Sequence, residues 1–177
     1  MRQALAVLAG VAALAVAACG EEDETDTFRS DAFPFTFSYP GDFRESEDVN
    51  ISSSAGATAE ETVAVGIEDH DALIVQKFPL RIAVTEKNLA RVQPEIDNLV
   101  REFDPQAAPS EVTEVAGRPA LSVPNVSVPG TEDARSDFTF IFDGDIEYLL
   151  NCQSTSEHAD EIEAACRQAL DTLAFSE

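Results

Sequence analysis

The clearest alternation of apolar and polar positions lies in residues 33–39. Aromatic side chains recur there at every second position: Phe33, Phe35, Phe37 and Tyr39. A repeat of two is the side-chain period of a β-strand, so we predict a strand whose aromatic face lies in the core. The Pro–Gly pair at residues 40–41 predicts a turn after this strand.

Weaker patterns follow along the chain. Residues 45–61 are polar and predict a loop. Residues 62–67 and 72–78 are apolar and rich in β-branched side chains, so each predicts a strand, and residues 81–84 predict another less clearly.

A helical repeat comes next, with Thr85 as its predicted N-cap. Its apolar positions fall at helical spacing: Leu89, Val92, Ile96, Leu99, Val100 and Phe103. Pro94 lies inside this pattern, where proline removes a backbone donor and crowds the preceding turn. We therefore expect either a kink or a fresh helix start with Pro94 in its first turn.

The remaining patterns predict strands and a closing helix. Residues 111–115 and 119–123 predict two strands around a turn at 116–118, and three prolines make the second strand irregular or an edge: Pro119, Pro124 and Pro129. Residues 137–152 predict a β-hairpin that turns at Asp143–Gly144. Its inward positions alternate along both limbs: Phe138, Phe140 and Phe142, then Tyr148, Leu150 and Cys152.

The closing helix is predicted to begin near Ser154, because residues 154–157 fit a capping box. Its buried stripe is Ile162, Cys166, Ala169, Leu170 and Leu173. The order of strands, helix, strands and helix, with short connections, favours an α+β fold with a mostly antiparallel sheet covered by helices. Residues 32–177 are long enough for one domain with a proper core.

The first 31 residues have a different pattern. A basic start at Arg2 precedes an apolar run over residues 4–18, which is the layout of a secretory signal and too short for a membrane span. Residues 16–19, Val-Ala-Ala-Cys, resemble the bacterial lipobox. This resemblance implies cleavage after residue 18 and a diacylglyceryl group on Cys19. The alternative is an ordinary signal peptide, which would leave Cys19 free or buried.

Residues 19–31 are then expected to be a disordered tether behind the lipidated cysteine, because their acidic side chains repel one another. The chain contains three cysteines, and lipidation of Cys19 leaves Cys152 and Cys166 to pair in an oxidising compartment. We predict this disulfide because Cys152 continues an inward strand face and Cys166 lies on the apolar stripe of the next helix. Two buried free thiols are the alternative.

The formal net charge is −23, from 11 basic and 34 acidic side chains. Such a surface repels phosphate backbones and excludes nucleic acid as a partner. It permits cationic or metal partners, but solubility or a salt-rich habitat explains it more simply.

Several motifs together resemble a known group. The segments "FPFTFSYPGDF" (33–43) and "EVTEVAGRPAL" (111–121), the aromatic hairpin, and the cysteine-bearing helix ending in "TLAF" are similar to PsbP-like domains and to the LpqN-like envelope lipoproteins of actinobacteria. The resemblance implies a three-layer α/β/α sandwich with a central, mostly antiparallel sheet. Those families share no catalytic residues, so none is carried over.

Candidate chemistry is sparse. His70 lies beside Glu68, Asp69 and Asp71, but neighbouring side chains point in different directions, so a solvated loop is expected in place of a metal site. His158 lies among carboxylates that complement the start of the last helix. The segment "DGDIE" (143–147) matches part of a calcium loop and is explained by the hairpin turn. No nucleophile elbow, phosphate loop or His-Glu-x-x-His motif occurs in the sequence.

The sequence therefore predicts no catalytic residue, no metal ligand and no cofactor. We expect a non-enzymatic accessory or binding domain, anchored to the cell membrane through Cys19 and facing the extracytoplasmic side. Its partner would be an envelope protein or a small ligand, held by loops at the sheet ends. The alternative is an envelope hydrolase with a site built from dispersed acidic residues.

Overall fold

The computed structural model describes residues 24–46, 59–68 and 70–176, and in these residues it has two helices and two antiparallel sheets. The central sheet has the order β3-β4-β5-β8-β7-β6. Its strands are β3 (Arg44–Ser46), β4 (Glu61–Glu68), β5 (Asp71–Val84), β6 (Glu111–Val115), β7 (Arg118–Ser127) and β8 (Arg135–Ser154). The small sheet has the order β1-β2-β9, with β1 (Thr25–Phe28), β2 (Phe35–Pro40) and β9 (Ala174–Phe175). The helices are α1 (Leu89–Phe103) and α2 (Ala159–Thr172).

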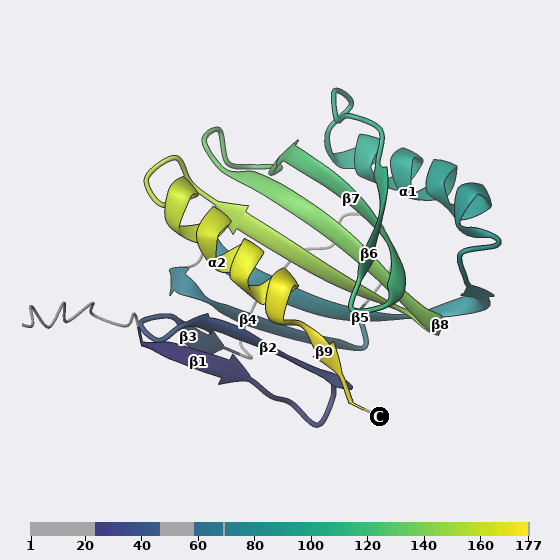
Figure 1. Ribbon diagram of the computed structural model, residues 1–177. Coiled ribbons are helices and arrows are strands. Elements are labelled where there is room, and N and C mark those ends of the chain that lie inside the picture. Colours follow the sequence, from purple (N-terminus) through teal and green to yellow (C-terminus); the bar gives the residue numbers. More distant parts are fainter. Residues whose placement is uncertain (1–23, 47–58, 69, 177) are drawn as a thin grey trace, which may run out of the picture.

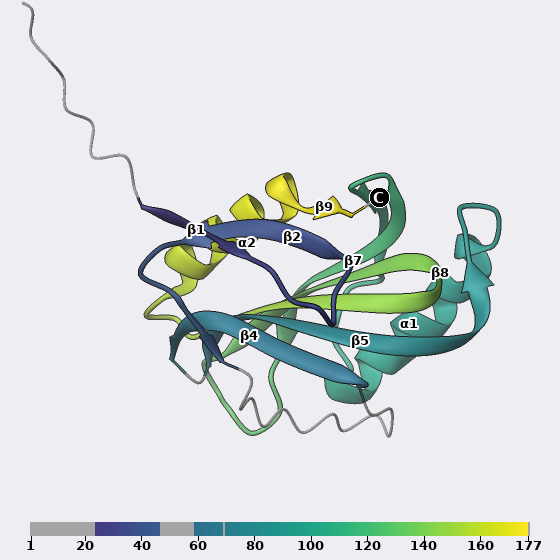
Figure 2. The ribbon, with the colours of Figure 1, turned by 90° about the horizontal axis from the view of Figure 1, so that it is seen from below.

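The elements form three layers (Figures 1 and 2). Helix α1 covers one face of the central sheet, over a core that includes Ile96, Val100 and Phe142. Helix α2 and the small sheet cover the other face, over a larger core that includes Phe37 and Ile162. The α+β fold with a central antiparallel sheet between helices is confirmed. One outer layer differs from the prediction, because α2 shares it with three strands.

The β8 segment is a hairpin within one extended stretch of chain, as Figure 1 shows. Its first limb pairs with β7, where Ile141 lies opposite Ala120, and its second limb pairs with β5, where Cys152 lies opposite Leu73. Both ends of β8 line the same pocket, which requires the segment to fold back. Gly144 has φ 65° at the bend, a conformation that glycine adopts without strain. The predicted hairpin is confirmed.

The aromatic strand is confirmed from Phe35 onward, whereas Phe33 lies just before β2. All four side chains predicted to face inward are buried: Phe33, Phe35, Phe37 and Tyr39. Strand β2 lies in the small sheet, between β1 and β9. Phe35 packs edge-on against Tyr148 of β8, with ring centroids 5.1 Å apart. The small sheet is thus joined to the central sheet by aromatic packing.

The prediction of a disordered tether up to residue 31 is wrong at its C-terminal end. Strand β1 pairs with β2 along its whole length, with Thr25 opposite Pro40. Phe28 is 0% exposed and stacks on Phe37 with ring centroids 4.6 Å apart. This polar segment has a sequence that does not favour a strand, but backbone pairing with β2 and burial of the Phe28 ring stabilise it as one. The domain therefore begins earlier than residue 32.

Both helices begin later than predicted. Helix α1 starts at Leu89, and the side-chain oxygen of Asn88 accepts a hydrogen bond from the Thr85 backbone N–H, 2.7 Å away. Thr85 is therefore part of the preceding turn and is not the N-cap. Pro94 lies inside α1, beyond its first turn, so the expectation of a fresh helix start at this proline is wrong. The capping box is also wrong, because Ser154 is the last residue of β8 and α2 starts at Ala159.

Two further boundaries differ from the sequence prediction. The predicted loop over residues 45–61 is shorter at both ends, because β3 extends to Ser46 and β4 begins at Glu61. Strand β7 is irregular, with a register shift between Val123 and Val126, but it lies between β6 and β8 and is no edge. Pro124 is tolerated because β6 pairs with β7 only as far as Ser122.

Residues 1–23 lie outside the described residues, so the signal peptide, Cys19 and the N-terminal part of the tether stay predictions. Residues 47–58 of the predicted loop also lie outside them. Across the three described ranges, neither helix is long and apolar enough to span a bilayer.

Candidate functional site

A disulfide lies beside the candidate site. Cys152, near the end of β8, is bonded to Cys166 of α2, and their Cα atoms lie 6.0 Å apart. Both cysteines are buried. The predicted bridge is confirmed, and it joins α2 to the central sheet beside a pocket.

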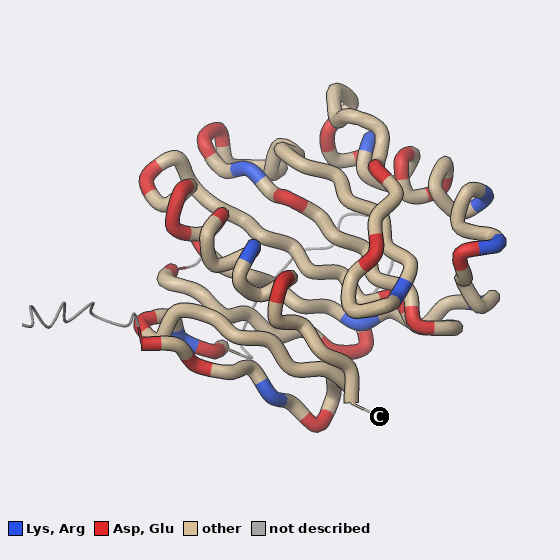
Figure 3. The backbone as a smooth tube through the Cα atoms, in the orientation of Figure 1, with Lys and Arg blue, Asp and Glu red and all other residues tan. Residues whose placement is uncertain are grey.

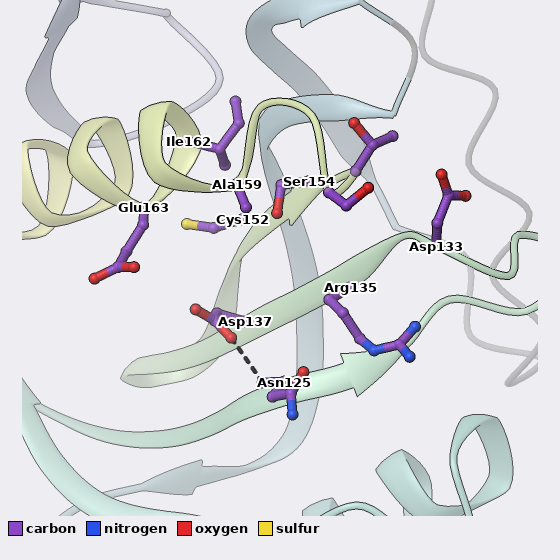
Figure 4. A pocket seen from close by; sticks show the side chains of 11 residues that line it. Asn125, Asp133, Arg135, Asp137, Cys152, Ser154, Ala159, Ile162 and Glu163 are labelled. Atoms are coloured by element: carbon purple, nitrogen blue, oxygen red, sulfur yellow. Dashed lines mark hydrogen bonds between the residues drawn. The ribbon is translucent and has the colours of Figure 1, made fainter.

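The pocket has a volume of about 530 Å³ and opens at the end of the sheet where β8 begins and ends (Figure 4). Four parts of the chain form it: the irregular part of β7 with the loop after it, both ends of β8, the loop between β8 and α2, and the first turns of α2. Its lining residues include Asn125, Asp137, Cys152, Thr155, Ala159 and Glu163. The loops at this end of the sheet thus form a hollow.

The irregularity of β7 shapes one wall of this pocket. Asn125 has φ 58°, in the left-handed region that asparagine adopts more readily than most residues. Its backbone N–H donates to Asp137 Oδ1 across 2.7 Å, shown as the dashed line in Figure 4. The bulge therefore positions both side chains at the pocket.

The lining is acidic. Asp133, Asp137 and Glu163 contribute carboxylates, and Arg135 is the one basic side chain among the described lining residues. The Arg135 guanidinium donates to the Ala134 carbonyl, 2.8 Å away, so part of its hydrogen-bonding capacity is used locally. Figure 3 shows further acidic positions on the β7–β8 loop and the first turns of α2. This acidic lining favours a cationic group over an anion.

Next to the pocket lies a group of three side chains, Glu68, Asp71 and His158, which we call the acid–histidine group. Glu68 ends β4 and Asp71 begins β5, and the two are paired across the hairpin turn. Paired residues of antiparallel strands project to the same face of the sheet, so Glu68 and Asp71 share a face. Because side chains alternate along a strand, Leu73 lies on this face as well, and α2 covers it.

His158 immediately precedes α2 and completes the group. One candidate ligand atom from each of the three side chains lies within 4.8 Å of the others. The imidazole Nε2 lies 3.6 Å from Glu68 Oε1, and Nδ1 lies 3.1 Å from Glu161 Oε2. The hydrogen bond to Glu161, followed by the negative charge of Asp71, raises the pKa of His158 above its usual value.

Thr155 connects the acid–histidine group to the pocket. It lines the pocket, and its backbone N–H donates to Asp71 Oδ1 across 2.7 Å. Its hydroxyl lies 3.0 and 3.1 Å from the two carboxylate oxygens of Asp71. Asp71 is 3% exposed, so the expectation of a solvated loop is wrong for this residue.

The other sequence candidates are placed apart from this group. His70 is exposed, and its Nδ1 lies 3.2 Å from the side-chain nitrogen of Gln153. Asp69 lies outside the described residues. Asp143, of the calcium-like segment, forms an ion pair of 2.7 Å with Arg118 at the hairpin bend.

Sequence reasoning missed the convergence of Glu68, Asp71 and His158. Glu68 and Asp71 lie close together between two predicted strands, and this short spacing is the sequence signal that could have shown their pairing. The approach of His158 has no local signal, because it depends on where α2 packs.

No family model matches the chain, and no curated protein matches it either. Among solved structures, the chain is similar to the cyanobacterial PsbP (CyanoP) of Synechocystis sp. PCC 6803, with 12% identity and a TM-score of 0.58 over 90% of this chain and 98% of that one. A protein of Bacteroides thetaiotaomicron VPI-5482 is similar at 13% identity and a TM-score of 0.51, over 85% of this chain and 48% of that one. LpqN, involved in cell envelope biogenesis of Mycobacterium tuberculosis, has 11% identity and a TM-score of 0.49, over 90% of this chain and 88% of that one. At these identities the likeness to CyanoP establishes the fold, and the chain has the fold of a PsbP-like domain.

Proposed function

We propose that the protein is a lipid-anchored accessory domain on the outer face of the cytoplasmic membrane, and that it binds an envelope partner or small ligand at the pocket between β7, β8 and α2. The pocket is the observation that carries the binding function. It is formed by loops and element ends, which are the usual places for binding residues on a rigid scaffold.

The anchor is supported by the lipobox-like residues 16–19 at the end of an apolar run. Two or three acyl chains give a stable anchor where one chain is marginal, since each buried methylene contributes about 0.8 kcal/mol. The disulfide supports the location, because such bonds persist in oxidising compartments outside the cytoplasm.

The early start of the fold limits how far the domain can lie from the membrane. The chain between Cys19 and Thr25 can span at most about 20 Å when fully extended. Strand β1 begins on the left of both ribbon views, and α2, whose first turns line the pocket, also begins there (Figures 1 and 2). In this proposal the pocket lies toward the anchored end, where a partner in or near the membrane would reach it.

The anchor is tested by cell fractionation and intact mass. The wild-type protein should partition with membranes and carry a diacylglyceryl group, and Cys19→Ala should release it or leave it unprocessed. An unmodified, water-soluble wild-type product would refute the anchor.

The pocket is tested with a matched pair of variants on α2. Ala159 lines the pocket, whereas Ala164 is exposed on the same helix and lies outside the lining. Proteins captured by the wild type from detergent-solubilised envelope should be lost with Ala159→Trp and retained with Ala164→Trp. Equal retention by both variants would contradict binding at this pocket.

A further inference from the structure

We propose that Glu68, Asp71 and His158 form a binding site for a divalent transition-metal ion of the zinc type. This inference goes beyond the proposed function, because it assigns a ligand to the acid–histidine group and does not depend on the anchor or on the pocket partner. Zinc in proteins is bound by imidazole nitrogen and by carboxylate oxygen, and three protein ligands leave one tetrahedral position open.

The buried carboxylate of Asp71 is the first argument for a cation. Within the described part of the chain, no lysine or arginine forms an ion pair with Asp71, and the ionisable base beside it is His158, a member of the same group. A buried charge is costly unless it is paired or coordinates a metal ion. Thr155 supplies one N–H to Oδ1 and a hydroxyl that both carboxylate oxygens share, so Oδ2 keeps lone pairs for another ligand.

The orientation of the imidazole is the second argument. Glu161 lies outside the acid–histidine group, and its carboxylate accepts from His158 Nδ1 across 3.1 Å. A proton on Nδ1 leaves the lone pair on Nε2, the nitrogen that faces Glu68. Metal-bound histidines usually make this second hydrogen bond to a carboxylate or carbonyl, which fixes the tautomer and the ring orientation. Glu161 is therefore a positioning residue in this proposal.

The spacing of the ligand atoms fits after a small movement. Zinc bonds of 2.0–2.2 Å in a tetrahedron place ligand atoms about 3.4 Å apart, compared with at most 4.8 Å in the acid–histidine group. Glu68 can close this gap, because its side chain is 68% exposed and free to change rotamer. Asp71 and His158 are held by Thr155 and Glu161 and need not move far.

The presence of imidazole distinguishes the metal class. Magnesium and calcium prefer oxygen ligands in six- to eight-coordinate shells, whereas imidazole suits zinc and its neighbours. A bound ion would hold the β4–β5 turn against the start of α2. It would also place positive charge beside Thr155 at the wall of the acidic pocket.

The chain has two histidines, which gives the experiment an internal control. We would titrate zinc chloride into the full chain, in detergent micelles and without a histidine tag, by calorimetry and by NMR of the imidazole resonances. We expect saturable binding of one ion at this site, with shifted His158 resonances and unchanged His70 resonances. His158→Gln should weaken binding at least tenfold, and the matched control His70→Gln should leave it unchanged.

Glu68→Gln tests the carboxylate at an exposed position, where loss of folding is not expected, and should also weaken binding at least tenfold. Glu161→Gln should weaken it by about 10–100-fold, as loss of a second hydrogen-bond partner does. Absence of saturable zinc binding, equal loss in His70→Gln, or magnesium binding as tight as zinc would each overturn the proposal. Unchanged zinc affinity in both His158→Gln and Glu68→Gln would place the ion elsewhere on the acidic surface and would also overturn it.

Discussion

Replacing Glu147 with glutamine should stabilise the protein at alkaline pH much more than at acidic pH. Glu147 lies on the second limb of β8, opposite Phe78 of β5, and is 8% exposed. Within the described residues, no hydrogen bond or ion pair reaches its carboxylate. Burial raises its pKa from 4.5 to about 7.

The sign of the effect follows from proton binding. Between pH 4.5 and about 7, the folded protein keeps a proton on Glu147 that the unfolded chain has lost. Stability therefore falls as pH rises through this range and stays lower above it. A shift from 4.5 to about 7 corresponds to about 3 kcal/mol at pH 8 and about 1 kcal/mol at pH 5.

Glu147→Gln removes this penalty because the amide is neutral and similar in shape. Urea unfolding of the variant and the wild type at several pH values between 5 and 8.5 measures the difference directly. We expect the variant to gain about 3 kcal/mol at pH 8, or about 6–12 °C in Tm for a chain of this size. The matched control is Asp145→Asn, an exposed acid on the same hairpin, which should change stability by less than about 0.5 kcal/mol. A gain that does not depend on pH, or a loss at pH 8, would refute the burial argument.

Three further predictions concern stability. Replacing both Cys152 and Cys166 by alanine should lower the free energy of unfolding by about 3 kcal/mol, because the bridge closes a loop with a sequence separation of 14. A double variant as stable as the wild type in urea would contradict this. Phe28→Ala should lower the free energy of unfolding by about 3–5 kcal/mol, because the ring is fully buried against Phe37. Native-state hydrogen exchange that shows no protected amides in β1 would contradict the place of this strand in the fold. Asp104→Ala should lower Tm at neutral pH, since the carboxylate accepts hydrogen bonds from the Ser127 and Gln106 backbone N–H groups and these bonds lower its pKa. That contribution is present above the unfolded pKa and disappears as pH falls through the lowered folded value, so the Tm difference should shrink in acid.

Much of the local structure followed from the sequence alone. The aromatic strand, the hairpin of β8 and the buried stripe of α2 were predicted because side-chain direction repeats with a period set by the backbone. The pairing of Cys152 with Cys166 was predicted for the same reason, since each cysteine continues an inward face and a short connection joins the two elements.

The tertiary structure decided which elements became partners. Strand β1 has one apolar side chain buried in the core, and it exists because β2 offers an edge and Phe37 offers a stacking surface. The backbone of Gly41 belongs to this junction, because its N–H donates to the Glu24 carbonyl across 2.7 Å. A local pattern cannot report such a partner, since backbone pairing is available to almost any sequence.

The candidate site also combines features that the sequence determines with contacts that only the packing of elements determines. The sequence contains the two ends of the β4–β5 turn and the acidic start of α2 as separate polar segments, and each alone suggests a solvated surface. They meet because the disulfide and the apolar stripe set α2 on the sheet beside that turn, which brings His158 to Glu68 and buries Asp71. Periodicity determines the face on which a side chain lies, whereas contact between distant segments depends on how whole elements pack, and this is fixed only when the core forms.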